Sequence, residues 1–208
     1  MSLPKGVKRR SFGGDQWLAT RGEPVYGEPT DSEWRRWDAR RSKLGAMFEH
    51  DMDLGLEGGE TVLYLGAAAG TTVSHVADFS GPTYAVEFAA RPARDLLDAA
   101  APRGNLFPLL KDARKPETYA HVVEPVDVIV QDVATHGQAT VALANQAFLR
   151  ENGRLLLAVK PRSEDVVREP SAVLSDVIDT LEDGYDVLET RSLEPFHDDH
   201  FGIVATPR

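Results

Sequence analysis

The stretch from residue 62 to residue 97, VLYLGAAAGTTVSHVADFSGPTYAVEFAARPARDLL, constrains the fold of this chain more than any other. An apolar run ends at two glycines, Gly66 and Gly70, a helix-length segment follows, and a second β-rich run ends at Glu87. A backbone that turns sharply out of a buried strand needs small residues, both to bend and to let a ligand approach. An acid about 20 residues further on can bond a ribose hydroxyl. The stretch therefore predicts the first half of a nucleotide-binding βαβ unit.

The rest of the chain continues this alternation. Strands are expected over 61–65, 83–87, 105–110, 126–132 and 154–160, and helices over 72–78, 91–101, 116–121, 138–149 and 172–181. Strands separated by helical segments predict a parallel, doubly wound sheet. Two final β-like runs, 185–193 and 201–206, predict a closing antiparallel hairpin. A mostly parallel sheet of seven strands is the plan of the Rossmann-like class I S-adenosylmethionine-dependent methyltransferases.

The N-terminal part reads differently. Residues 1–30 are rich in Gly, Pro and charge, which predicts a small irregular or β-hairpin appendage. Next, Asp31 or Ser32 could cap a helical pattern. Five residues of this pattern can pack: Trp34, Trp37, Leu44, Met47 and Phe48. A helix is expected over part of 40–50. We therefore expect an appendage with a linking helix over 1–50 and a methyltransferase-like domain over 51–208.

Composition narrows the class of protein. The chain has 208 residues, of which 42% are hydrophobic and 27% charged, as in globular proteins. No apolar run approaches the roughly 20 residues that span a bilayer, and the N-terminus has no signal-peptide core. The absence of cysteine excludes disulfides, thiolate catalysis and cysteine-ligated metals. These features predict a cytoplasmic protein with no membrane contact.

Charge is distributed unevenly. Residues 1–50 carry ten Lys or Arg against seven acids, a net charge of +3, so the other 158 residues sum to −13 within the total of −10. The bulk charge repels nucleic acid. Any RNA contact is therefore expected to be local, helped by partners and close to the basic N-terminal part.

The carboxyl ends of parallel strands share one crevice, where ligands bind. Polar or Gly-rich residues stand at five of these ends: Gly66 to Thr72, Glu87-Phe88, Asp112-Ala113, Asp132 and Lys160. A phosphate-binding Rossmann loop is the rival interpretation of GAAAGTT. The loop lacks the second glycine of G-x-G-x-x-G, and the chain has no GK[ST] of a P-loop. A ligand without phosphates, with adenosine and an amino-acid tail, fits better.

Several motifs extend this interpretation to a family. They are VLYLGAAAGTTVSHVAD, YAVEFAARPARDLL, DAR at 112–114, VDVIVQDVA at 126–134, VYGE at 25–28 and RSKL at 41–44. With these motifs the chain resembles the archaeal fibrillarins, 2′-O-methyltransferases of box C/D ribonucleoproteins, from about Trp17 onwards. The resemblance implies an S-adenosylmethionine site, with no metal, formed by Gly66, Ala67, Gly70, Thr71, Thr72, Glu87, Phe88, Asp112, Ala113, Asp132, Val133, Ala134 and Thr135.

Roles within that site also follow from the resemblance. Thr71 and Thr72 would lie at the methionine end, Glu87 on the ribose, and Phe88 against the adenine. The residues Asp112 and Ala113 would lie at the adenine edge, and Asp132 to Thr135 would flank the sulfonium.

The resemblance implies a catalytic set of Lys43, Asp132, Lys160 and His200. A ribose 2′-hydroxyl is a poor nucleophile near neutral pH, so a positioned base should take its proton. Lys160 is the candidate base, because a nearby cation and partial burial both disfavour a charged amine. Asp132 would orient this amine and Lys43 would supply the cation.

Plainer interpretations of these residues stay open. Lys160 and Lys43 could be surface lysines, His200 could be a turn histidine, and His197 is its near competitor. The basic set from Arg35 to Arg41 could be a solvated helix face or a contact for RNA or a partner.

The sequence also departs from the family pattern. Pro161 replaces a small residue, Glu164 stands where an isoleucine-like residue is expected, and Thr135-His136 replaces Gln-Pro.

The expected function is guide-RNA-directed ribose 2′-O-methylation of ribosomal RNA, with transfer RNA as a second candidate substrate. The implied partners are a box C/D guide RNA with its target, a Nop-domain scaffold protein and a kink-turn-binding ribosomal-type protein. Methyl transfer to another acceptor, such as a protein glutamine, and a non-catalytic cofactor-binding subunit are the alternatives.

Overall fold

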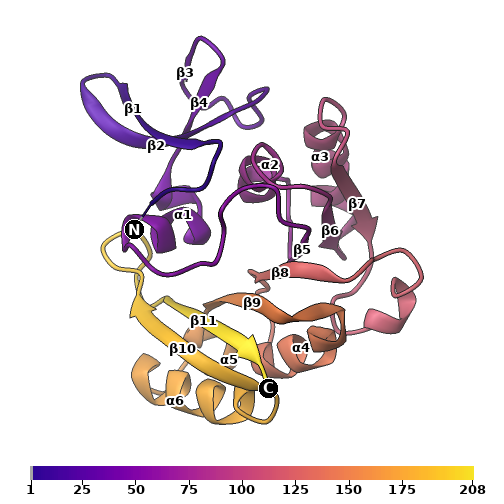
Figure 1. Cartoon of the computed structure of the whole chain (residues 1–208). Coiled ribbons are helices and arrows are strands. Elements are labelled where there is room, and N and C mark those ends of the chain that lie inside the picture. The colour runs from indigo at the N-terminus through magenta and orange to yellow at the C-terminus, as the bar shows by residue number, and fades with distance from the viewer. Residues whose placement is uncertain (1) are drawn as a thin grey trace.

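The computed structural model describes residues 2–208, which form two sheets of very different size (Figure 1). The smaller sheet is antiparallel, with strand order β1-β2-β4-β3. Its strands are β1 (Val7–Phe12), β2 (Asp15–Arg21), β3 (Thr30–Asp31) and β4 (Trp34–Trp37). The first two strands form the β-hairpin predicted for residues 1–30, and its turn contains Gly13 and Gly14, both at positive φ.

The helix pattern predicted from Asp31 or Ser32 is wrong at its start. The segment from Trp34 to Trp37 is a strand, with both tryptophans buried, and Ser32 lies in the turn before it at a φ of 55°. The helix begins later, because the Ser42 hydroxyl accepts the amide of Gly45 and so caps its first turn. After the short 3₁₀ turn η1 (Ala39–Arg41), helix α1 (Lys43–Glu49) therefore occupies the predicted part of 40–50.

The larger sheet has the predicted seven strands in the order β10-β11-β9-β8-β5-β6-β7. They are β5 (Val62–Leu65), β6 (Thr83–Glu87), β7 (Leu106–Leu110), β8 (Val126–Gln131), β9 (Leu149–Val159), β10 (Tyr185–Ser192) and β11 (Phe201–Pro207). Neighbours from β7 to β9 pair in parallel, and β11 pairs antiparallel with both β9 and β10. The closing antiparallel hairpin is confirmed.

Helices cover both faces of this sheet (Figure 1). They are α2 (Thr71–Ala77), α3 (Ala90–Ala100), α4 (Gln138–Asn145), α5 (Pro161–Glu164) and α6 (Pro170–Leu181), with short 3₁₀ turns η2 (Pro116–Thr118) and η3 (Gln146–Phe148). Successive residues of β5 point to opposite faces, as strand geometry requires. Tyr64 joins the core cluster that contains Leu96 of α3, whereas Leu63 joins the cluster that contains Ala142 of α4.

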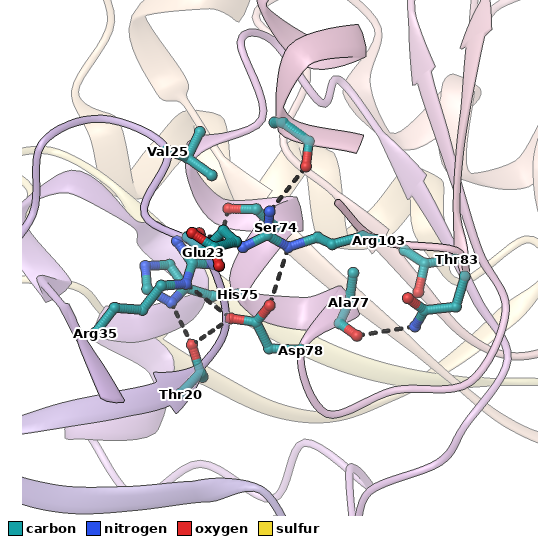
Figure 2. A network of polar contacts seen from close by, with 12 residues as sticks. Thr20, Glu23, Val25, Arg35, Ser74, His75, Ala77, Asp78, Thr83 and Arg103 are labelled. Atoms are coloured by element: carbon teal, nitrogen blue, oxygen red, sulfur yellow. Dashed lines mark hydrogen bonds and ion pairs between the residues drawn. The ribbon is translucent and has the colours of Figure 1, made fainter. Parts of the chain in front are cut away.

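A buried polar network joins the small sheet to helix α2 (Figure 2). The guanidinium of Arg35, on β4, is fully buried and lies 2.5 Å from a carboxylate oxygen of Glu28 and 2.8 Å from one of Asp78. Arg103 pairs with the other oxygen of Asp78 at 3.0 Å. A buried charge is tolerated only when it is paired and hydrogen-bonded. The network therefore fixes the small sheet to the helix that follows the GAAAGTT loop.

His75 extends this network as an uncharged link. Its ring is fully buried and stacks on Trp37, and burial, with the charges of Arg35 and Arg103, lowers its pKa well below the ordinary value. Thr20 donates its hydroxyl proton to Asp78 at 2.7 Å, so it accepts from His75 Nδ1 at 2.7 Å. The Nε2 atom of His75 is then the acceptor that faces the Tyr26 hydroxyl at 3.0 Å.

Within residues 2–208, no helix combines the length and apolarity needed to cross a membrane. The division of the chain at residue 50 stays a prediction.

Candidate active site

A cavity of about 290 Å³ opens at the carboxyl ends of five neighbouring parallel strands. This is where Brändén's rule places a ligand. Fifteen residues line it: Gly66, Ala68, Val86, Glu87, Phe88, Lys111, Asp112, Ala113, Arg114, Asp132, Val133, Ala134, Thr135, Val141 and Lys160.

The first glycine of GAAAGTT allows two strand ends to approach closely. Gly66 has a φ of 84°, and a Cβ there would lie 2.7 Å from the carbonyl oxygen of Asp132. Both its conformation and its surroundings therefore require glycine. Gly70, with a φ of 89°, packs in the same way against Ala99 of α3. The loop consequently holds the end of β5 beside the end of β8.

Glu87 is fixed at the cavity by backbone donors. Its carboxylate accepts the amide of Ala68 at 2.9 Å and that of Ala89 at 2.7 Å, and the residue is only 8% exposed. The adjacent Phe88 also lines the cavity, yet 70% of its surface is exposed. A rigid carboxylate beside an exposed aromatic ring suits a nucleoside.

Asp112 faces the cavity within a side-chain fork. Arg114 donates to it from Nε at 2.9 Å and from Nη2 at 2.7 Å, and this hydrogen bonding lowers the pKa of the Asp112 carboxyl. Ala113, between them, is buried, and its carbonyl accepts the side-chain amide of Asn145 at 2.8 Å.

Two lysines converge on one carboxylate that lines the cavity, that of Asp132. The Lys160 Nζ atom lies 2.7 Å and the Lys43 Nζ atom 3.3 Å from Oδ1 of Asp132. Lys160 also donates to the backbone carbonyl of Asp132 at 3.0 Å. The three residues come from the start of α1 and the ends of β8 and β9, so the fold brings Lys43 to two side chains that lie more than 80 positions further along the chain.

The surroundings of Lys160 disfavour its charged form. Burial lowers its pKa below the ordinary 10.5, and the charge of Lys43 lowers it further, while the charge of Asp132 and the hydrogen bond to it act in the opposite direction. Two ammonium groups and one carboxylate leave one excess positive charge in a partly buried site. Loss of one proton removes that excess.

The two candidate histidines lie in the turn before β11. His200 bonds the carbonyl of Asp198 through Nδ1 at 2.6 Å, and His197 bonds that of Ala39 through Nε2 at 2.7 Å. Burial, and to a lesser extent the charge of Lys43, lowers the pKa of His197. Over residues 2–208, no hydrogen bond or ion pair joins His200 to Lys43, Asp132 or Lys160.

The predicted cofactor residues divide into two groups. Nine line the cavity: Gly66, Glu87, Phe88, Asp112, Ala113, Asp132, Val133, Ala134 and Thr135. Four do not: Ala67, Gly70, Thr71 and Thr72. Of these, Thr72 is buried against the hydroxyl of Tyr64, and Thr71 lines a separate groove together with Tyr26 and Arg41.

Five lining residues are not among the named cofactor or catalytic residues, although Ala68 and Arg114 lie within stretches that the sequence interpretation quoted. Ala68, Val86, Lys111 and Arg114 each stand one or two positions from a predicted residue, so a wider window at each strand end would find them. Val141 lies on α4, and no pattern in the sequence points to it.

The sequence model of the fibrillarin family matches residues 15–208. The chain belongs to the fibrillarin family. Several curated relatives carry the name fibrillarin-like rRNA/tRNA 2′-O-methyltransferase. That of Haloarcula marismortui is 70% identical over 208 residues, covering 100% of this chain and 99% of the relative. That of Methanosarcina mazei is 49% identical over 195 residues, covering 88% of this chain and 86% of the relative.

Solved fibrillarin structures have the same fold. A fibrillarin in complex with Nop5p is 40% identical, with a TM-score of 0.92 over 100% of both chains. Aeropyrum pernix fibrillarin with natively bound S-adenosyl-L-methionine is 41% identical, with a TM-score of 0.88 over 99% of this chain and 96% of that one. The N-methyltransferase NodS of Bradyrhizobium japonicum is 12% identical, with a TM-score of 0.58 over 81% of this chain and 93% of that one. It shares the fold alone. The predicted family and fold class are confirmed.

Proposed function

We propose that this fibrillarin-family chain is the catalytic subunit of a box C/D ribonucleoprotein and methylates ribose 2′-hydroxyls of ribosomal and transfer RNA. The observation that carries the proposal is the Lys43–Asp132–Lys160 cluster, of which Asp132 and Lys160 line the strand-end cavity. An activated amine is what a weakly acidic hydroxyl needs to become a nucleophile. A cytoplasmic location is part of the same proposal, in keeping with the archaeal relatives.

The cavity fits S-adenosylmethionine better than a nucleotide with phosphates. The loop Gly66 to Thr72 lacks the second glycine that admits a pyrophosphate, while Val86, Phe88 and Val141 offer apolar surface for a base. Glu87 would hold the ribose, and Asp112 and Ala113 would border the adenine. When bound, the cofactor supplies an electrophilic methyl group.

The chain's own residues then prepare the acceptor. Neutral Lys160 takes the proton of the ribose 2′-hydroxyl at its Nζ atom. Asp132 holds that amine through its side chain and its carbonyl oxygen, so the nitrogen has a fixed position. The charge of Lys43 lowers the pKa of Lys160 and so favours its neutral state. We retain His200 as a proposed fourth member, to be tested beside His197.

This mechanism predicts the sign of the pH dependence. Only deprotonated Lys160 can accept a proton, so the rate should rise with pH and level off above the pKa of Lys160, which burial holds below 10.5. Single-turnover rates across the pH range, with target RNA and cofactor saturating, measure this directly. A rate that falls over the same range would contradict the assignment of a lysine base.

An exposed pair of arginines offers a route for RNA to this cluster. Arg40 and Arg41 directly precede the α1 cap, and both are exposed. They contact aromatic rings, with Arg40 6.0 Å from the ring centre of Phe196 and Arg41 4.6 Å from that of Tyr26. Within residues 2–208, no ion pair joins either one to an acid. Arg35, by contrast, is buried, so the basic set from Arg35 to Arg41 is not one continuous RNA surface.

Removing this pair of arginines should weaken RNA binding and make the affinity for RNA less dependent on salt. Each phosphate contact contributes about 0.7 to the slope of log affinity against log salt for single strands, so Arg40→Ala with Arg41→Ala should reduce the slope by about 1.4. The measurement is kcat/KM for target RNA in the assembled particle at several salt concentrations. A matched control is Arg10→Ala with Arg21→Ala, whose side chains pair with Asp31 and Glu33. Equal slopes for both double variants would exclude the arginine pair as a phosphate contact.

Dependence on assembly tests the proposed particle. Methyl transfer to RNA should require the guide RNA, a Nop-domain scaffold protein and a kink-turn-binding protein together, because the acidic bulk of the chain disfavours RNA binding alone. The assay uses labelled cofactor with each component omitted in turn. Equal transfer by the isolated chain, retained in high salt, would contradict the proposal.

A further inference from the structure

Gln138, the first residue of α4, holds the backbone of Lys160 at two points. The side chain is fully buried, its Oε1 atom accepts the Lys160 amide at 2.9 Å, and its Nε2 atom donates to the Lys160 carbonyl at 3.1 Å. The backbone carbonyl of Gln138 in turn accepts the side chain of Gln131, which ends β8 next to Asp132. Gln138 therefore connects the ends of β8 and β9, with its side chain bonded to Lys160 and its backbone carbonyl bonded to Gln131.

Glu164, at the end of α5, determines which way this amide points. Its Oε1 atom accepts the Gln138 Nε2 at 3.0 Å and the Gln138 backbone amide at 2.6 Å, and its Oε2 atom accepts the Gly137 amide at 2.8 Å. An ionised carboxylate accepts only, so the Nε2 end of Gln138 must face it and the Oε1 end must face the Lys160 amide. The same carboxylate caps the first turn of α4, where negative charge is favourable.

His136, in the loop that leaves β8, lies near the same carboxylate. Its Nε2 atom is 3.9 Å from Oε2 of Glu164, which belongs to the segment that leaves β9. Glu164 therefore contacts both segments.

We propose that Gln138 and Glu164 are positioning residues for Lys160: they hold its backbone, and so the origin of its side chain, at a fixed place beside Asp132. The inference rests on the proposed role of Lys160 as the base. A displacement of about 1 Å in a reacting group can cost 10²-fold in rate, so a looser backbone at Lys160 should act on turnover rather than on substrate binding.

The test compares Glu164→Ala with Asp165→Ala in the assembled particle. Asp165 is a matched control, because its carboxylate also accepts two backbone amides in the same loop, those of Val167 and Arg168. Glu164→Ala should lower kcat about 10-fold, with KM for RNA and the cofactor Kd within about 2-fold. Asp165→Ala should leave all three unchanged. Glu164→Gln, which keeps one acceptor oxygen, should restore part of the lost kcat.

Hydrogen exchange at the Lys160 amide gives a second readout that does not depend on catalysis. Exchange in Glu164→Ala should be faster than in the wild type and in Asp165→Ala. Faster exchange with an unchanged kcat, or an equal kcat loss in both alanine variants, would overturn the positioning role. If Glu164→Ala does not fold, the kcat of Glu164→Gln decides, and a wild-type value would overturn the proposal. Full activity of a Lys160 variant would instead remove the base assignment, whatever the exchange result.

Discussion

Lys160→Arg should abolish most methyl transfer while the protein still binds its cofactor and RNA. Arginine keeps the positive charge beside Asp132 but is not deprotonated in proteins, so it cannot take a proton from the ribose. General base catalysis typically contributes about 10²- to 10⁴-fold, and we expect a loss of that size in the single-turnover rate. Cofactor binding, measured by titration calorimetry, should change little.

Lys115→Arg provides the control for this change. Lys115 is exposed and lies just before η2, outside the cavity. The same substitution there should leave the rate unaltered. A wild-type rate for Lys160→Arg would remove Lys160 as the base and direct attention to the two histidines.

Arg35→Met should cause the largest loss of stability among the charged residues of the small sheet. It would leave Glu28 buried with its ion pair removed and would deprive Asp78 of one of its two arginines. Breaking a buried pair in this way costs about 3–5 kcal/mol, because the remaining charge has lost both water and its partner. Urea unfolding followed by circular dichroism measures the change.

Arg10→Met is the matched comparison, since Arg10 pairs with Asp31 in an exposed position. An exposed pair contributes about 0–1 kcal/mol, so this variant should be near wild type. Similar losses in the two variants would show that the Arg35 network does not anchor the small sheet to α2.

The site residues at the strand ends could be predicted from the sequence, because each of them stands at the end of a recognisable β-rich run. Glu87, Asp112, Asp132 and Lys160 each follow or close a β-rich run, and parallel strands end at one edge of the sheet. To predict that these residues meet at one cavity, only the alternation of strands and helices was needed. The particular contacts within the cavity, such as the Asp112–Arg114 fork, needed the coordinates.

The segment from Trp34 to Trp37 shows where sequence reasoning failed. Its two tryptophans suit a helix or a strand, and the two arginines between them suggested an exposed face. Arg35 is buried because of Glu28 and Asp78, and Asp78 stands 43 positions away in the chain. Local patterns carry no information about a partner at that separation.

The identity of the methylated atom tests the central claim most directly. The assembled particle, with a labelled methyl donor and a target RNA paired to the guide, should place the label on a single ribose 2′-oxygen, as read by nuclease digestion and mass spectrometry. A target with a 2′-deoxyribose at that position should receive no label. Label on a base, on a protein glutamine, or on the 2′-deoxy target would contradict the proposed activity.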